Sequence, residues 1–302
     1  MDIVVFGAGS LGSLVGGLLA REHAVTLVAR AAHADAVRES GLRLDGVGDE
    51  YPDRVFPAAT TDGTGLEADL AIVAVKSFDT AAAAEALATG SFEAVLSLQN
   101  GMGNEATLAA RLEAPVLAGT ATYGAILREP GVVDCTGVGE VVLGARDGGP
   151  SDTADRVGEA FATAGLETTV ADDMPRRLWE KLAVNAAINP VTALTATENG
   201  AVLAEPATDL ARSAARETAR VARACDVTLS DRDALAAMEG VAEATAANTS
   251  SMRQDVLADR RTEIDAINGY VVDRAADHVL EVPTNQILAA LVRTWERGRD
   301  VR

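Results

Sequence analysis

Lysine is nearly absent from this chain of 302 residues. The sequence has 26 basic residues against 45 acidic ones, a net charge of −19, and the only lysines are Lys76 and Lys181. So acidic a chain is repelled by nucleic acids and anionic membranes, and we expect neither as a partner. Strong acidity with scarce lysine is typical of a cytoplasm rich in salt, where screening removes most self-repulsion. Drift of composition towards arginine and alanine is the alternative explanation.

Long apolar runs and closely spaced cysteines are also missing. No run approaches the ~20 apolar residues of a membrane-spanning helix, and no targeting signature precedes the first predicted strand. Cys135 and Cys225 are far apart and show no metal-ligand spacing, so no metal site is expected. The simplest interpretation is a reduced, cytoplasmic protein. The length predicts one large domain or two ordinary ones.

The first thirty residues contain a G-x-G-x-x-G motif in a suitable context. Residues 3–6 form an apolar run typical of a buried strand, GAGSLG follows at residues 7–12, and residues 24–29 predict a second strand. In such a unit Gly7 permits the tight turn, Gly9 lets the backbone approach a pyrophosphate, and Gly12 allows close helix–strand packing. The motif predicts a dinucleotide site formed by Gly7, Ala8, Gly9, Ser10, Leu11 and Gly12. A glycine-rich turn without a ligand is the alternative.

Arg30 ends the second predicted strand, where an NAD site usually carries an acidic residue. An acid there would accept hydrogen bonds from the ribose 2′-hydroxyl and repel a 2′-phosphate, whereas arginine offers that phosphate a planar fork of donors. We therefore expect NADP(H) as the cofactor. The alternative is an ordinary solvated surface arginine.

Strands and helices alternate as far as residue 170. Strands are predicted at residues 42–44, 55–59, 69–75, 93–98, 116–122, 131–135, 140–144 and 166–170, and helices at 31–40, 78–88, from about 104 to 112, and at 151–164. This alternation predicts an α/β fold with a parallel, doubly wound Rossmann-type sheet. From Pro175 onward only helical periodicity remains. We therefore expect a nucleotide-binding domain at residues 1–170 and an all-helical substrate-binding domain at 171–302.

Two further polar signatures follow predicted strands of the first half. Lys76 comes after one strand and Asn100 after the next. Ligands of open α/β sheets bind outside the carboxyl ends of the strands. Lys76 is expected to meet cofactor phosphate or ribose, and Asn100 a nicotinamide ribose or a substrate hydroxyl. Either could instead be an ordinary turn residue.

Lys181, Asn185 and Asn189 stand at i, i+4 and i+8, so they share one face of a helix. Pro190 is expected to kink or end that helix after Asn189. Because an unpaired asparagine in a packed helix is costly, this face predicts a polar pocket. A solvated helix face is the alternative.

Two further motifs lie later in the helical half. Asn248 and Ser251 are expected to share a face. Thr262 and Asp265 have the spacing of a capping box, which would start a helix at Thr262 and place Glu263 in its first turn. Glu263 could act there only by stabilising the helix dipole.

Together these segments resemble the ketopantoate reductase (2-dehydropantoate 2-reductase) family. The matches are GAGSLG at 7–12, VKS at 75–77, QNGMGN at 99–104, KLAVNAAINPVTALTATENG at 181–200, and NTSSMRQD with RRTEIDAINGY between 248 and 270. They span nearly the whole chain in the family's order, and the helical motifs are more specific than the glycine loop. The departures are in composition, namely the acidity and the loss of lysine.

The resemblance implies NADPH-dependent reduction of 2-dehydropantoate to pantoate on the route to coenzyme A. It implies that Lys181 is the proton donor, and this would explain why that lysine survives where lysine is depleted. The substrate-binding candidates are Asn100, Asn185, Asn189, Asn199, Asn248 and Ser251. The cofactor-binding candidates are residues 7–12 with Arg30, Lys76, Asn100, Ala125 and Glu263.

The expected site lies in a cleft between the two halves, and a homodimer built on the helical half is a further expectation. A rival interpretation is a reductase of the same fold that acts on another small 2-oxo acid. A second is a non-catalytic NADPH-binding regulator, which would have no reason to keep Lys181 at this spacing. A third is an acidic interaction protein, which would have no use for the pocket motifs.

Overall fold

A computed structural model of the chain describes residues 1–48 and 53–302. It contains two compact units. The first comprises residues 1–99 and 104–174, and the second comprises residues 100–103 and 175–302. The units therefore divide between Met174 and Pro175. The sequence predicts this boundary four residues earlier, between residues 170 and 171.

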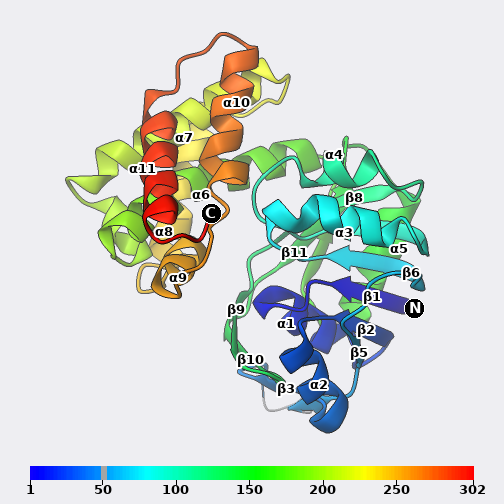
Figure 1. Cartoon of the computed structure of the whole chain (residues 1–302). Coiled ribbons are helices and arrows are strands. Elements are labelled where there is room, and N and C mark those ends of the chain that lie inside the picture. Colours follow the sequence, from blue (N-terminus) through cyan, green and yellow to red (C-terminus); the bar gives the residue numbers. More distant parts are fainter. Residues whose placement is uncertain (49–52) are drawn as a thin grey trace. The chain divides into compact units, whose positions relative to one another are not determined.

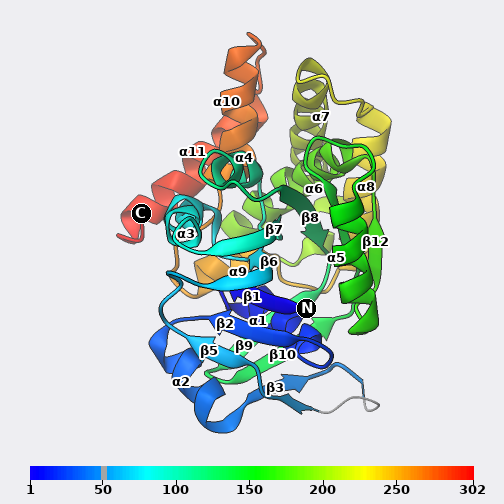
Figure 2. The same ribbon diagram turned by 90° about the vertical axis from the view of Figure 1, so that its right-hand side faces the viewer.

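The first unit is built on a sheet with the strand order β12-β11-β8-β7-β6-β1-β2-β5. Its strands are β1 (Asp2–Phe6), β2 (Ala24–Val28), β5 (Ala58–Thr60), β6 (Glu67–Val73), β7 (Ser91–Ser97), β8 (Val116–Ala121), β11 (Val141–Ala145) and β12 (Thr168–Val170). Figure 2 shows β7, β6, β1, β2 and β5 stacked in this order. The neighbouring pairs from β5 to β8 are parallel.

Helices cover both faces of this sheet. They are α1 (Ser10–Leu19), α2 (Ala31–Ser40), the 3₁₀ turn η1 (Ser77–Asp79), α3 (Thr80–Leu87), α4 (Asn104–Ala109) and α5 (Asp152–Thr163) (Figure 1). Strand β6 shows the two-sided burial, because Leu70 and Ile72 join one apolar core while Ala71 and Val73 join another. Side chains of successive strand residues point to opposite faces, so both faces are packed. The predicted doubly wound Rossmann-type architecture is confirmed.

The sheet predicted as parallel contains one antiparallel pair, near one of its edges. Strand β11 pairs with β8 in the antiparallel sense, with Leu143 opposite Gly119. A second sheet, of order β4-β3-β10-β9, consists of β3 (Leu42–Asp45), β4 (Arg54–Val55), β9 (Gly124–Glu129) and β10 (Val132–Gly137). Strand β9 lies outside the strands predicted from the sequence. Periodicity alone reports that a strand exists, whereas its partner is chosen by tertiary contacts.

The predicted strand at 55–59 is in fact two strands in different sheets. Strand β4 ends at Val55 and β5 begins at Ala58. Pro57 lies between them, and proline cannot donate to a strand ladder, so a break there is expected. Residues 49–52, between the strands predicted at 42–44 and 55–59, lie outside the described residues.

The second unit contains helices and no strands among its described residues. Its elements are α6 (Met174–Thr195), the 3₁₀ helix η2 (Asn199–Leu203), α7 (Ala207–Ala224), α8 (Asp231–Ala244), α9 (Ser251–Leu257), the π-helix η3 (Asp265–Gly269), α10 (Tyr270–Asp277) and α11 (Pro283–Gly298). Helix α6 contributes to both apolar cores of this unit, through Leu182 to one and Ile188 to the other. Within the described chain no helix has the length and apolar character that crossing a membrane requires.

Helix α6 continues through Pro190 to Thr195. The predicted end of this helix after Asn189 is therefore wrong. Pro190 has no N–H to give to the carbonyl of Ala186, one turn earlier. The side-chain amide of Asn268 donates to that carbonyl instead, at 2.9 Å. This replacement donor explains how a proline is tolerated within a helix of 22 residues.

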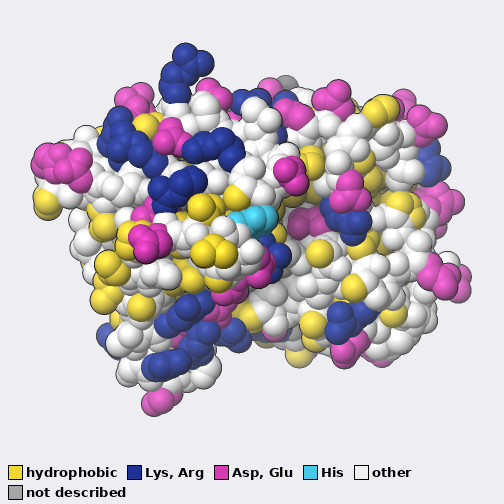
Figure 3. Space-filling model, turned by 90° about the horizontal axis from the view of Figure 1, so that it is seen from above, with side chains coloured by type: hydrophobic (Ala, Val, Ile, Leu, Met, Phe, Trp, Pro, Cys, Tyr) yellow, Lys and Arg dark blue, Asp and Glu magenta, His cyan; other side chains and the backbone are white. Residues whose placement is uncertain are grey.

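The surface carries both kinds of charge. Figure 3 shows acidic and basic side chains interspersed on the face in view. Many of the arginines form ion pairs with nearby acids, as Arg212 does with Glu239 and Arg128 with Asp134. These pairs locally offset the excess of acidic residues.

Candidate functional site

The glycine loop between β1 and α1 has the geometry that the motif predicts. Gly7 has a φ of +100°, and a Cβ there would lie 2.6 Å from the backbone nitrogen of Val75. A Cβ on Gly12 would lie 2.3 Å from the carbonyl oxygen of Gly7. By contrast, a Cβ on exposed Gly9 would meet nothing within 4 Å. The first and third glycines are thus required by packing, and the second leaves open space over the N-terminus of α1, as pyrophosphate binding requires.

Ser10 ties this loop to strand β9. Its hydroxyl oxygen accepts a hydrogen bond from the backbone N–H of Leu127 at 3.0 Å. Ala125 lies two residues earlier on the same strand and is half-buried. The structure therefore brings the β9 backbone to the glycine loop, although no pattern in the sequence identified β9.

Arg30 and Lys76 both lie just beyond the carboxyl ends of strands in this unit. Arg30 is exposed and occupies the N-cap position of α2, after β2. Lys76 is half-buried and occupies the N-cap position of η1, after β6. Because β1, β2 and β6 are parallel neighbours, both cations lie at the same edge of the sheet as the glycine loop. This edge can bind a polyanion such as a dinucleotide phosphate.

A buried polar network supports the loops at this edge. The side-chain amide of Gln99 donates to the carbonyl of Val75 at 3.1 Å and to the hydroxyl of Thr80 at 2.7 Å. The Thr80 hydroxyl lies within hydrogen-bond distance of the carbonyl of Ser77 and of the side-chain oxygen of Asn104. Sequence reasoning missed this support. The only signal was the run of polar residues around position 100.

In the second unit, α6 displays the predicted polar face. Lys181 and Asn185 are half-buried, and Asn189 is 6% exposed. The flanking residues Leu182 and Ile188 are fully packed in apolar cores. An ammonium and two amides therefore stand in a row along one buried helix.

Ser251 begins α9 beside the end of this row. The preceding residue, Ser250, caps α9 by accepting from the N–H of Arg253, and its hydroxyl lies 2.7 Å from that of Thr192 on α6. Thr192 is one turn beyond Asn189. The Ser250–Thr192 contact thus places the start of α9 against the last turn of α6.

Asn199 and Asn248 lie together, but the expected shared face of Asn248 and Ser251 is wrong. Helix α9 begins only at Ser251, and Asn248 lies exposed in the bend before it. Its carbonyl accepts the backbone N–H of Asn199 at 3.0 Å. The Asn199 side chain donates to Thr245 at 3.0 Å and is 8% exposed.

The segment around Asn100 packs on the helical unit. The N–H of Met102 donates to the carbonyl of Ala266 in η3 at 2.9 Å. Gly101 has a φ of +80°, and a Cβ there would lie 2.6 Å from the same oxygen. Asn100 is therefore held by its chain neighbours against the π-helix, which Asn268 in turn attaches to α6.

The predicted capping box at Thr262 does not form. The helix begins as a π-helix at Asp265, and the N–H of Thr262 donates to Glu296 rather than to Asp265. The Thr262 hydroxyl accepts from the N–H of Ile264 at 3.3 Å. Glu263 is 5% exposed and lies in the turn between them. The competing acceptor comes from α11, more than thirty residues away, which local spacing could not reveal.

Comparison with known proteins assigns the chain to a family. Residues 3–148 match the model described as "Ketopantoate reductase PanE/ApbA", and residues 173–296 match "Ketopantoate reductase PanE/ApbA C terminal". The chain is 46% identical over 304 residues to the 2-dehydropantoate 2-reductase of Halobacterium salinarum, covering 98% of this chain and 99% of the relative.

Solved structures with a similar fold include one from the same family. The crystal structure of a PanE/ApbA family ketopantoate reductase from Ralstonia eutropha has a TM-score of 0.90 and 36% identity, with 99% of this chain and 100% of that chain covered. A ternary structure of D-mandelate dehydrogenase with NADH and anilino(oxo)acetate has a TM-score of 0.92 at 24% identity, covering 100% of both chains; this second likeness shows the fold alone. With two family models matching most of its length and a close full-length relative, the chain belongs to the ketopantoate reductase family.

Proposed function

We propose that this chain catalyses the NADPH-dependent reduction of 2-dehydropantoate to pantoate, on the route to coenzyme A. The observation that carries the proposal is the polar face of α6, where Lys181, Asn185 and Asn189 follow one another along a partly buried helix. Family membership over the full length supports the same reaction. A regulator that only bound the cofactor would not need this face.

Lys181 is the proton donor of the proposed reaction. A bound nicotinamide would supply a hydride to the ketone carbon, which would leave negative charge on the ketone oxygen. An ammonium within hydrogen-bond reach stabilises that charge and can pass its proton to the oxygen. An arginine would stabilise the charge but would hold its proton too tightly to donate it. This difference accounts for a lysine at position 181 in a chain with 24 arginines and two lysines.

The amide and hydroxyl groups of the helical unit bind the substrate. A small 2-oxo acid presents a carboxylate and hydroxyl groups, which need hydrogen-bond donors and acceptors. The proposed partners are Asn100, Asn185, Asn189, Asn199, Asn248 and Ser251. Asn199 has a buried side-chain oxygen without a hydrogen-bond partner among the described residues, which suits it to accept from a substrate hydroxyl.

The glycine loop and its neighbours bind NADPH. Residues 7–12 fit a pyrophosphate, since the space above Gly9 is open. Arg30 binds the 2′-phosphate and Lys76 the phosphate or ribose, while Ala125, Asn100 and Glu263 contact the remainder of the cofactor. Exposed Arg30 has no ion pair with any residue in the described ranges 1–48 and 53–302, so its guanidinium is available to a phosphate.

A single assay tests this function. Purified protein is mixed with NADPH, and its absorbance is followed with 2-dehydropantoate and with a panel of other 2-oxo acids. We expect the highest kcat/KM for 2-dehydropantoate. A higher value for another 2-oxo acid would assign that acid as the substrate, and no oxidation with any of them would contradict the reductase function.

We further propose that the protein acts in the cytoplasm as a homodimer built on the helical unit. Ile287 and Leu291 lie one turn apart on α11 and are 57% and 50% exposed, an apolar pair that a second copy could cover. Light scattering tests the dimer. The acidic composition fits a salt-rich cytoplasm, and measuring activity against potassium chloride concentration tests this.

A further inference from the structure

Thr262 and Asp265, one residue before and two residues after Glu263, both bind side chains of α11. On one side, the backbone N–H and the hydroxyl of Thr262 donate to the same carboxylate oxygen of Glu296, at 2.8 and 2.7 Å. Thr262 is 1% exposed and Glu296 is fully buried. Hydrogen bonds to a buried carboxylate are strong, so this side of the turn is firmly fixed.

On the other side, Asp265 receives several arginines. Its Oδ1 accepts from Nε of Arg293 at 2.8 Å, and its Oδ2 accepts from Arg302 at 2.7 Å, while Arg261 lies 3.5 Å away. Burial alone would raise the pKa of Asp265, but Arg293 and Arg302 outweigh this effect and lower the pKa. The carboxylate therefore stays ionised and paired near neutral pH.

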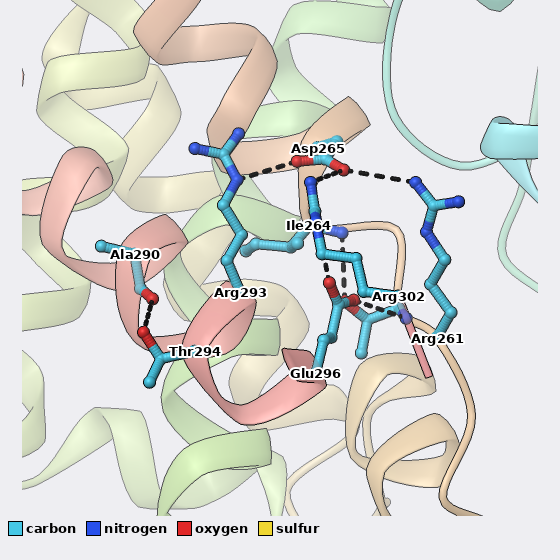
Figure 4. A network of polar contacts seen from close by, with 9 residues as sticks. Arg261, Ile264, Asp265, Ala290, Arg293, Thr294, Glu296 and Arg302 are labelled. Carbon is cyan, nitrogen blue, oxygen red and sulfur yellow. Dashed lines mark hydrogen bonds and ion pairs between the residues drawn. The ribbon is translucent and has the colours of Figure 1, made fainter. Parts of the chain in front are cut away.

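One guanidinium joins the two sides. Arg302 donates through one terminal nitrogen to Glu296 at 2.6 Å and through the other to Asp265 at 2.7 Å. Figure 4 shows its side chain between the two carboxylates. The planar fork of arginine supplies two donors in fixed directions, which a lysine cannot do.

We propose that Arg302 is a positioning residue for Glu263, acting through Glu296 and Asp265. The inference rests on the proposed function, in which Glu263 contacts the cofactor. Glu263 lies between Thr262 and Asp265 in the chain, so the contacts of these two residues fix the turn that carries Glu263. A binding group must be held in its productive geometry by supporting contacts, which is the role that Glu296, Asp265 and Arg302 have at this turn.

Arg302→Ala tests the inference, with Arg299→Ala as the matched control. Arg299 lies three residues earlier and its side chain also pairs with an aspartate, Asp259, at 3.3 Å. It contacts Glu296 only through its backbone N–H, which an alanine keeps. The dissociation constant of NADPH is measured by fluorescence titration without substrate, and thermal stability is measured in parallel. We expect Arg302→Ala to weaken NADPH binding roughly tenfold, as the weakening of one charge-assisted hydrogen bond would do. Arg302→Lys should restore part of the loss, and Arg299→Ala should leave binding unchanged.

A double-mutant cycle separates positioning from a general loss of structure. If Arg302 acts through Glu263, Arg302→Ala combined with Glu263→Gln weakens NADPH binding hardly more than Glu263→Gln alone. Additive losses would overturn the inference, as would a lower melting temperature with unchanged NADPH affinity, or no effect of Glu263→Gln. The titration needs no 2-oxo acid, so a wild-type protein that fails to reduce 2-dehydropantoate would count against the proposed function alone.

Discussion

Asn268 supplies Ala186 with the hydrogen bond that Pro190 cannot make. The side-chain amide of Asn268 is fully buried and lies 2.9 Å from the Ala186 carbonyl. The same amide nitrogen also donates to the side-chain oxygen of Asn285 at 2.9 Å. One asparagine in the π-helix thus fixes the segment that follows Glu263 to the helix that carries Lys181.

Asn268→Leu should destabilise the protein by roughly 2–4 kcal/mol, because it leaves two buried acceptors without donors. In a Pro190→Ala background the cost should be about 1 kcal/mol smaller, since alanine restores a backbone N–H to Ala186. Urea denaturation of the two single variants and the double variant measures the difference. Strictly additive changes would show that Asn268 does not substitute for the missing N–H.

Val279→Gly should stabilise the protein. Val279 follows the C-cap residue of α10 with a φ of +56°, is 91% exposed, and belongs to a Schellman motif in which the N–H of Leu280 donates to Ala275. A branched residue in the left-handed region costs ~1–2 kcal/mol of folding free energy. Glycine removes this cost, but it loses more backbone entropy on folding, which offsets part of the gain. We expect a gain of about 1 kcal/mol, seen as a higher melting temperature.

Val279→Ala is the control for that gain. It removes the same exposed branch but keeps a Cβ, so it should gain less than the glycine variant. If both variants have the same melting temperature as the wild type, conformational strain at Val279 is negligible.

Stability should depend on the protonation of His33. Its Nδ1 accepts from the N–H of Gly131 and its Nε2 lies 3.0 Å from the hydroxyl of Ser13, so the ring is neutral in the folded chain. Burial lowers the pKa of His33. The unfolded state then binds the proton more readily, and stability falls as the pH drops below ~6.5.

Melting temperatures between pH 7.5 and 5 measure this dependence. The His33→Gln variant should be less stable at pH 7.5 but should lose less on acidification than the wild type. Parallel pH curves for the two proteins would assign the dependence to other groups.

Arg30→Asp should weaken NADPH binding far more than NADH binding. A charge-assisted hydrogen bond contributes about 1.5–3 kcal/mol, which corresponds to a loss of roughly 10- to 150-fold for the 2′-phosphate cofactor. Arg38→Asp, on the same helix and paired with Asp35, makes the same change in net charge and serves as the control. Equal losses for both cofactors would refute the assignment of Arg30 to the 2′-phosphate.

Lys181→Ala should lower kcat by roughly 10²–10⁴-fold, the usual effect of losing a general acid. Lys181→Arg is the sharper comparison, because it keeps the charge yet holds its proton, so it should remain slow while binding the anionic substrate. Arg176→Lys, in the first turns of the same helix and exposed, provides the control. Near-normal kcat in Lys181→Arg would mean that the residue acts by charge alone.

The sequence by itself determined the elements whose physics is local. The apolar run, the three glycines and the following helix are adjacent in the chain, so the nucleotide motif at residues 7–12 could be predicted with the separate task of each glycine. The polar row of Lys181, Asn185 and Asn189 follows from helical spacing alone. The switch from alternating strands to helices near residue 170 is likewise a property of neighbouring residues.

Only the tertiary structure decided where distant groups replace local partners. Pro190 fails to end α6 because Asn268, almost eighty residues later, donates in its place. Thr262 forms no capping box because Glu296 takes its N–H, and β9 and β11 find partners that periodicity does not specify. A buried donor or acceptor takes whichever partner the fold brings within about 3 Å, and sequence separation places no limit on that choice.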